Sequence, residues 1–167
     1  GSVASLFISR WDRAIVDDVP ETLHNRLGIA IGQKAYKAYL DLINSPRWQR
    51  ALNFGARPQR LLWASTGSKD PNASDVLYIT SLASPFTVNT MPEQTLKALA
   101  DHGDLGDALP ADGGDSETLL NDFTQAGVDN QALAARLQEE GAESFVKSWN
   151  ELMEVITTKS ESLVQAD

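Results

Sequence analysis

The sequence predicts an α/β protein in which parallel strands alternate with helices, followed by an all-helical acidic tail. Three short apolar runs, at 3–8, 61–64 and 86–88, each lead into residues with hydroxyl, amide or cationic side chains. A helical stretch separates each run from the next, which is typical of parallel strands in βα units. Because ligands bind at the carboxyl ends of the strands in such folds, these polar clusters form the candidate site.

The first βα unit begins with the strand at about 3–8, and an irregular stretch follows it through Pro20. Apolar residues at helical spacing then predict a helix over 27–43. Ser45 and Pro46 end that helix and start a short one at 47–52, since proline is unfavourable inside a helix but favoured in its first turn.

The second and third units follow the same plan. A turn at 55–58 leads into the second strand, and a loop at 70–75 precedes a helix at 76–82. The third strand runs into a helix that starts at Pro92 and ends at Gly103.

From Asp104 onward no further β-rich run occurs, and helices are expected at 116–126, 129–140 and 143–163. The last helix has an apolar face made of Phe145, Trp149, Leu152 and Ile156. The sequence therefore divides into three βα units at 1–103 and an acidic helical extension at 104–167, which we expect to pack on them.

Composition limits the possible functions. With 167 residues, 42% of them hydrophobic, the chain can bury a sizeable core as one globular body. The net charge of −9 is uneven, at +3 for residues 1–100 and −12 for 101–167, and the acidic tail argues against nucleic acid. No apolar run is long enough for a membrane span, and no secretory signal is found. The absence of cysteine fits a cytoplasmic protein.

Three motifs, at 3–10, 62–71 and 87–92, resemble transaldolase in its longer bacterial and plant-type branch. The resemblance implies the C-terminal part of a (β/α)₈ TIM barrel, strands six to eight with their helices, plus a helical C-terminal extension. A complete barrel of this type needs eight strands in roughly 250 residues. The remaining N-terminal part of the barrel is therefore an expected partner of this chain.

Transaldolases are class I aldolase-type transferases of the non-oxidative pentose phosphate pathway in carbohydrate metabolism. The resemblance implies transfer of a dihydroxyacetone unit through a lysine Schiff base, with no cofactor. The implied substrates are fructose 6-phosphate, sedoheptulose 7-phosphate, erythrose 4-phosphate and glyceraldehyde 3-phosphate.

The Schiff-base lysine of the family belongs to strand four, outside this chain, and the six lysines present agree with that placement. Five lie at polar helical positions and Lys69 follows a strand in a loop, so none is desolvated within an apolar strand. We expect this segment alone to be inactive and to contain no catalytic residue. His24 and His102 are isolated and lack ligand spacing, so no metal site is expected.

The family's pattern on the first of these strands is matched by Ser5, Phe7 and Arg10. Ser5 and Phe7 are two residues apart, so alternation places them on one strand face, as a pocket lining requires. Arg10 would hold the sugar phosphate through its planar set of donors. The alternative is an ordinary surface ion pair between Arg10 and Asp12.

Ser65 matches a phosphate-binding serine of the family. The best-known branch has an arginine two positions later, where this chain has Gly67, and Lys69 is the candidate substitute. A hydroxyl-rich turn with a solvated Lys69 is the alternative. Asn89 could bond substrate oxygens at the end of the third strand, while Thr90 could instead cap the following helix.

Two other functions remain open at this point. One is a non-catalytic phosphosugar-binding module, which would bind sugar phosphates without turnover. The other is the transaldolase part of a fusion with phosphoglucose isomerase, a form that some members of the branch take. Trp63 and Phe54 are expected in the core rather than as stacking platforms.

Overall fold

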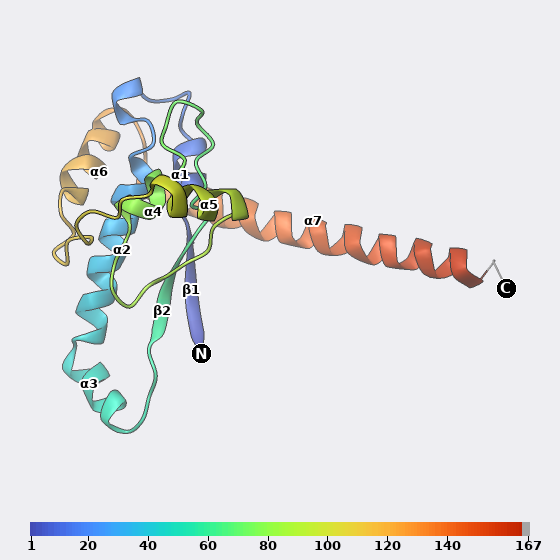
Figure 1. The fold of residues 1–167 in the computed structure, drawn as a ribbon, viewed down its shortest axis with the longest axis horizontal. Coiled ribbons are helices and arrows are strands. Elements are labelled where there is room, and N and C mark those ends of the chain that lie inside the picture. The colour runs from blue at the N-terminus through green and yellow to red at the C-terminus, as the bar shows by residue number, and fades with distance from the viewer. Residues whose placement is uncertain (165–167) are drawn as a thin grey trace. The chain divides into compact units, whose positions relative to one another are not determined.

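The computed structural model describes residues 1–164 and divides them into two compact units, one of residues 1–129 and a second that starts at Asn130. The first unit is a mixed α/β structure with a three-stranded parallel sheet (Figure 1). Its elements are β1 (Ser2–Phe7), α1 (Ile8–Arg13), a 3₁₀ turn (Glu21–Leu23), α2 (Leu27–Ile43), α3 (Pro46–Asn53), β2 (Gln59–Ala64), α4 (Leu77–Ser81), β3 (Val88–Asn89), α5 (Glu93–His102) and α6 (Ser116–Gln125).

The sheet has the order β1-β2-β3, and both pairings are parallel. Leu6 lies beside Trp63, and Trp63 lies beside Asn89. The three expected strands are therefore confirmed as neighbours with their carboxyl ends at one edge. The first ends earlier than expected, because Ile8 starts α1 and is completely buried in the core.

The third strand is shorter and later than the expected 86–88. Phe86 has a φ of +63° and is 68% exposed, so it belongs to the loop before β3. A bulky residue in the left-handed region cannot continue a strand.

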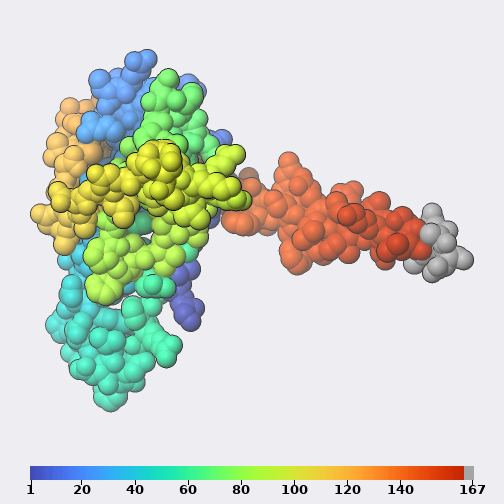
Figure 2. Space-filling model, in the orientation of Figure 1, coloured from blue at the N-terminus to red at the C-terminus, as the bar shows by residue number. Residues whose placement is uncertain are grey.

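The core lies on the side of the sheet that α2 contacts. Its buried cluster is Ile8, Tyr36, Tyr39, Trp63, Tyr78, Leu82 and Leu109. The space-filling view shows α5 and the segment after it, drawn in yellow, crossing the front of this unit (Figure 2). Trp63 is a core residue as expected, whereas the expectation for Phe54 is wrong: it ends α3 and is 92% exposed.

Two glycines let α2 pack closely on its neighbours. A Cβ at Gly28 would lie 2.6 Å from the carbonyl oxygen of Ile8 and 2.7 Å from Asp12 Oδ2. At Gly32 the nearest atom to a Cβ would be a methyl of Leu82, at 2.7 Å, which can move by a rotamer change. A Cβ at Gly28 would instead meet the backbone of α1, which cannot move in this way.

We expect Gly28→Ala to lower the free energy of unfolding by about 1–3 kcal/mol, because the backbone of α1 must move to relieve the clash. Gly32→Ala is the matched control and should cost less. Thermal melts of the two variants check this, and an equal effect at both positions would contradict it.

The second unit is one helix, α7 (Asn130–Val164). Two helices separated near Gly141 were expected, and that expectation is wrong. A helical glycine costs only about 1 kcal/mol relative to alanine, and no proline is present to end the helix. Phe145, Trp149 and Ile156 are exposed within this unit, and the packing of the extension on the βα units stays a prediction.

Candidate functional site

The candidate site is built from segments that follow the carboxyl ends of β1 and β2 and from the end of β3. α1 follows β1 directly, a hydroxyl-rich turn at 65–68 follows β2, and Asn89 is the last residue of β3. Because the strands are parallel neighbours, these segments meet at one edge of the sheet. The structure therefore places these polar segments along one edge of the sheet.

Ser5 and Phe7 share one face of the sheet, as alternation predicts. Ser5 pairs in register with Leu62 and Phe7 pairs with Ala64, so the four side chains lie on the same side. Ser5 is exposed and Phe7 is half-buried. This face is opposite to the one that carries Leu6 into the core.

Asn89 lies on the other face of the sheet. It pairs in register with Trp63, whose side chain is in the core. Its Oδ1 accepts a hydrogen bond from Thr66 Oγ1 at 2.9 Å, and the same hydroxyl lies 3.0 Å from the Thr90 carbonyl oxygen. The structure therefore separates Asn89 from Ser5 and Phe7 and joins it to a buried threonine that holds the turn after β2.

Thr90 does not cap the following helix. Helix α5 has Pro92 as its N-cap residue, without a side-chain hydrogen bond. The Thr90 backbone N–H instead donates to the Trp63 carbonyl at 3.0 Å, a hydrogen bond of the β2–β3 pairing.

Arg10 lies over Phe7. Its guanidinium carbon is 4.2 Å from the centre of the Phe7 ring, a cation–π distance that links the two residues by stacking. The alternative of a surface ion pair between Arg10 and Asp12 is wrong, because Asp12 is buried and bonded elsewhere. A guanidinium held over a ring face keeps N–H donors that can bind an anion.

Ser65 begins the turn after β2 and is held by α1. Its Oγ lies 2.8 Å from the Ser9 Oγ, and its carbonyl oxygen accepts the Ser9 N–H at 3.1 Å. Ser65 has a φ of +56°, which is uncommon for a residue with a side chain. These contacts join the segments that contain Arg10 and Ser65.

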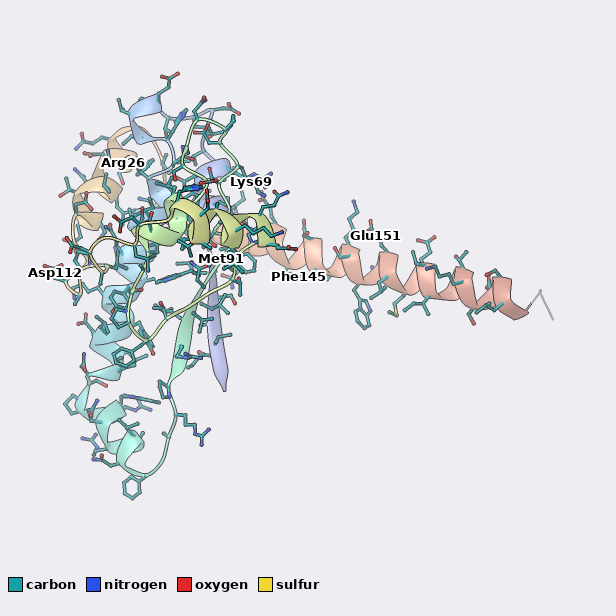
Figure 3. The ribbon with its side chains drawn as sticks, viewed as in Figure 1. Arg26, Lys69, Met91, Asp112, Phe145 and Glu151 are labelled. Carbon is teal, nitrogen blue, oxygen red and sulfur yellow. The ribbon has the colours of Figure 1, made fainter. Side chains whose placement is uncertain are left out.

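Lys69, which is labelled in Figure 3, is exposed. It lines a hollow of about 820 Å³ beside α1. The other residues lining this hollow include Ser9, Asp12, Asp70 and Tyr78. Neither Arg10 nor Ser65 belongs to its lining. The structure thus brings Arg10 to Phe7 and Ser65 to Ser9, and it gives Lys69 a different setting.

Sequence reasoning missed Asp12, which is the most highly connected side chain at this end of the fold. Its Oδ1 accepts the Leu27 N–H at 2.8 Å, and its Oδ2 accepts the Gly28 N–H at 3.1 Å and the Tyr78 hydroxyl at 2.9 Å. Asp12 is 6% exposed. It therefore ties α1 to the start of α2 and to α4.

Burial raises the pKa of the Asp12 carboxyl above its usual value, although its three hydrogen bonds lower that pKa in part. Burial and the neighbouring Asp12 likewise raise the pKa of the Tyr78 hydroxyl. The sequence contains no local signal for this network, because Gly28 and Tyr78 lie far from Asp12 along the chain.

All six lysines are exposed: Lys34, Lys37, Lys69, Lys97, Lys147 and Lys159. An amine nucleophile near neutral pH needs desolvation or a nearby cation to lower its pKa. Lys37 has the opposite environment, since a hydrogen bond from its amine to Asp41 raises its pKa. The described lysines therefore lack the burial that a Schiff-base lysine uses.

Two absences hold for residues 1–164, the part of the chain that the structure describes. No cluster of three or more His, Cys, Asp or Glu side chains that could bind a metal ion was found there. Within the same residues, no helix combines the length and the apolar character needed to cross a bilayer.

Comparison with known proteins gives one consistent result. The family model described as Transaldolase/Fructose-6-phosphate aldolase matches residues 1–156. A transaldolase of Parafrankia sp. is 42% identical over 163 residues, which are 93% of this chain and 44% of that protein. A transaldolase of Thermobifida fusca is 42% identical over 161 residues, covering 92% of this chain and 44% of that protein.

The chain thus spans less than half the length of these curated relatives. The similarity nevertheless includes all three strands and every segment that builds the carboxyl edge of the sheet. It confirms the resemblance that the motifs indicated. The chain belongs to the transaldolase/fructose-6-phosphate aldolase family.

Proposed function

We propose that this chain is the C-terminal part of a transaldolase and supplies its phosphate-binding edge and one wall of its substrate pocket. The observation that carries the proposal is the family match over residues 1–156, which includes the strand edge where Arg10 and Ser65 lie. In this proposal β1, β2 and β3 are strands six to eight of a (β/α)₈ barrel. The N-terminal part of the barrel would complete the pocket on the sheet face that carries Ser5 and Phe7.

Arg10 and Ser65 are the proposed phosphate ligands. A guanidinium offers charge-assisted hydrogen bonds in a planar arrangement that suits two phosphate oxygens. Ser65 adds a hydroxyl from the next strand, and Ser5 and Phe7 line the pocket wall. Lys69 would contribute positive charge at the rim, because it is exposed and free to move toward an anion.

Asn89 has a different proposed role from direct substrate contact. Its amide oxygen already accepts the Thr66 hydroxyl, so we assign it to positioning the turn that contains Ser65.

The proposed reaction transfers a dihydroxyacetone unit between sugar phosphates through a lysine outside this chain. The lysine amine condenses with the ketose carbonyl and releases water. The bond between the α and β carbons of the resulting iminium then breaks: the β hydroxyl loses its proton and becomes the aldehyde of the released aldose phosphate, while the iminium takes up the electron pair as an enamine. The three-carbon unit adds to a second aldose phosphate, and water releases the new ketose phosphate and the free amine. We also propose that this reaction belongs to the pentose phosphate pathway and that the protein acts in the cytoplasm.

A non-catalytic phosphosugar-binding module is the second candidate, because Arg10 and Ser65 could bind a sugar phosphate without a desolvated lysine, and the six lysines of this chain are all exposed. The test is to incubate the complete protein with fructose 6-phosphate and erythrose 4-phosphate and to measure the products. Formation of sedoheptulose 7-phosphate and glyceraldehyde 3-phosphate supports the transaldolase. Binding of fructose 6-phosphate without these products would instead support the module.

A further inference from the structure

We propose that Ser9 is a positioning residue that orients the Ser65 hydroxyl so that its proton points to the substrate phosphate. The proposal rests on the proposed function, because it assigns a role relative to the phosphate ligand Ser65. Ser9 is the residue before Arg10 on α1, and it contacts the turn after β2 through both its backbone and its side chain.

The direction of the hydroxyl–hydroxyl hydrogen bond follows from burial. Ser9 is only 2% exposed, and Ser65 Oγ is its one side-chain hydrogen-bond partner among the described residues. If Ser9 accepted this bond, its own proton would have no protein acceptor among the described residues, and although Ser9 lies at the wall of the hollow beside α1, only 2% of it reaches solvent, so this arrangement is costly. Ser9 therefore donates and Ser65 accepts.

This direction leaves the Ser65 proton free. Ser65 is less buried than Ser9, and its hydroxyl can still donate one hydrogen bond. A phosphate oxygen accepts hydrogen bonds but cannot donate them when it is ionised, so a serine that must bind phosphate has to present its proton. The Ser9 hydroxyl sets that orientation before the ligand arrives, and a donated hydrogen bond also strengthens Ser65 as a donor.

The backbone contact supports the same role. The Ser9 N–H bonds to the Ser65 carbonyl at 3.1 Å, and Ser65 has the unfavourable φ of +56°. Residues in such conformations persist only where surrounding contacts hold them, and they concentrate at functional sites. Ser9 precedes Arg10 on α1 and contacts Ser65, so it links the two proposed phosphate ligands.

The test measures binding of inorganic phosphate to the complete protein by calorimetry, together with KM and kcat for fructose 6-phosphate. We expect Ser9→Ala to weaken phosphate binding and raise KM by about tenfold, with little change in kcat, since one hydrogen bond to a charged ligand loses its orientation. Alanine suits a helical position, and circular dichroism checks that the variant folds. In a Ser65→Ala background, Ser9→Ala should have no further effect.

Ser84→Ala is the matched control. Ser84 is half-buried and its Oγ lies 3.2 Å from the Thr87 hydroxyl, but it precedes β3 at the other end of the strands. This variant should leave phosphate binding unchanged. An unchanged affinity in Ser9→Ala, or a loss that persists in the Ser65→Ala background, would overturn the role of Ser9. Phosphate binding that responds as expected in a protein without transaldolase activity would overturn the proposed function alone.

Discussion

Replacing Arg10 with alanine is expected to lower kcat/KM for fructose 6-phosphate by about 100-fold, the largest effect on activity that the structure predicts. Arg10 is the one cationic side chain stacked on an aromatic ring of the site, at 4.2 Å from the centre of Phe7, among the residues that the structure describes. Two charge-assisted hydrogen bonds to phosphate would be lost. Steady-state kinetics of the complete enzyme measure the change.

The loss should depend on the phosphate group. Turnover of unphosphorylated fructose should change little in Arg10→Ala, since that substrate lacks the phosphate group that Arg10 would bind. Arg10→Lys should recover only part of the activity, because lysine keeps the charge but loses the planar donors and the stacking on Phe7. Arg57→Ala is the control, since Arg57 is exposed and precedes β2 at the amino end. Equal losses with both substrates would contradict a phosphate contact.

Replacing Asp12 with alanine is expected to lower the free energy of unfolding by about 3 kcal/mol, the largest effect on stability. The change removes the acceptor of two backbone N–H groups and of the Tyr78 hydroxyl, and it leaves these donors buried. α1 would lose its main attachment to α2 and α4. Thermal melts measure the loss, with Asp18→Ala as an exposed aspartate control.

The raised pKa of Asp12 also predicts that the stability of the fold depends on pH. Its pKa is raised in the folded state from the usual 3.8, mainly by burial. As the pH falls through the folded pKa toward 3.8, the folded state takes up a proton before the unfolded state does, so folding is favoured. The Tm of the native protein relative to Asp12→Asn should therefore rise as the pH falls over this range. A difference that is constant or falls toward acid pH would contradict the raised pKa.

The three βα units could be predicted because their signals are local. The helix over 27–43 was expected at the same residues as α2. The short helix expected at 47–52 is α3, which begins at Pro46, and the Ser45 side chain accepts a hydrogen bond from the Trp48 N–H at its start. The tail was expected to hold separate helices at 129–140 and 143–163, but α7 continues through Gly141, because one glycine destabilises a helix too weakly to interrupt it. Local pattern thus predicted element types better than their ends.

The details of the site could be predicted only in part. Alternation was enough to place Ser5 and Phe7 on one face, but the face of Asn89 depends on its register with Trp63, which is a tertiary property. The Asp12 network joins residues up to 66 positions apart. No local pattern contains such a contact, so the Asp12 network was missed, while Arg10 and Ser65 stay predicted phosphate ligands.

Borohydride trapping tests the central claim most directly. The complete protein is incubated with fructose 6-phosphate and sodium borohydride, which reduces a lysine imine to a stable amine, and the modified peptide is identified by mass spectrometry. We predict an adduct of the three-carbon unit on a lysine outside this chain and none on the six exposed lysines within it. An adduct on Lys69, or no adduct anywhere in a protein that binds the sugar, would contradict the account.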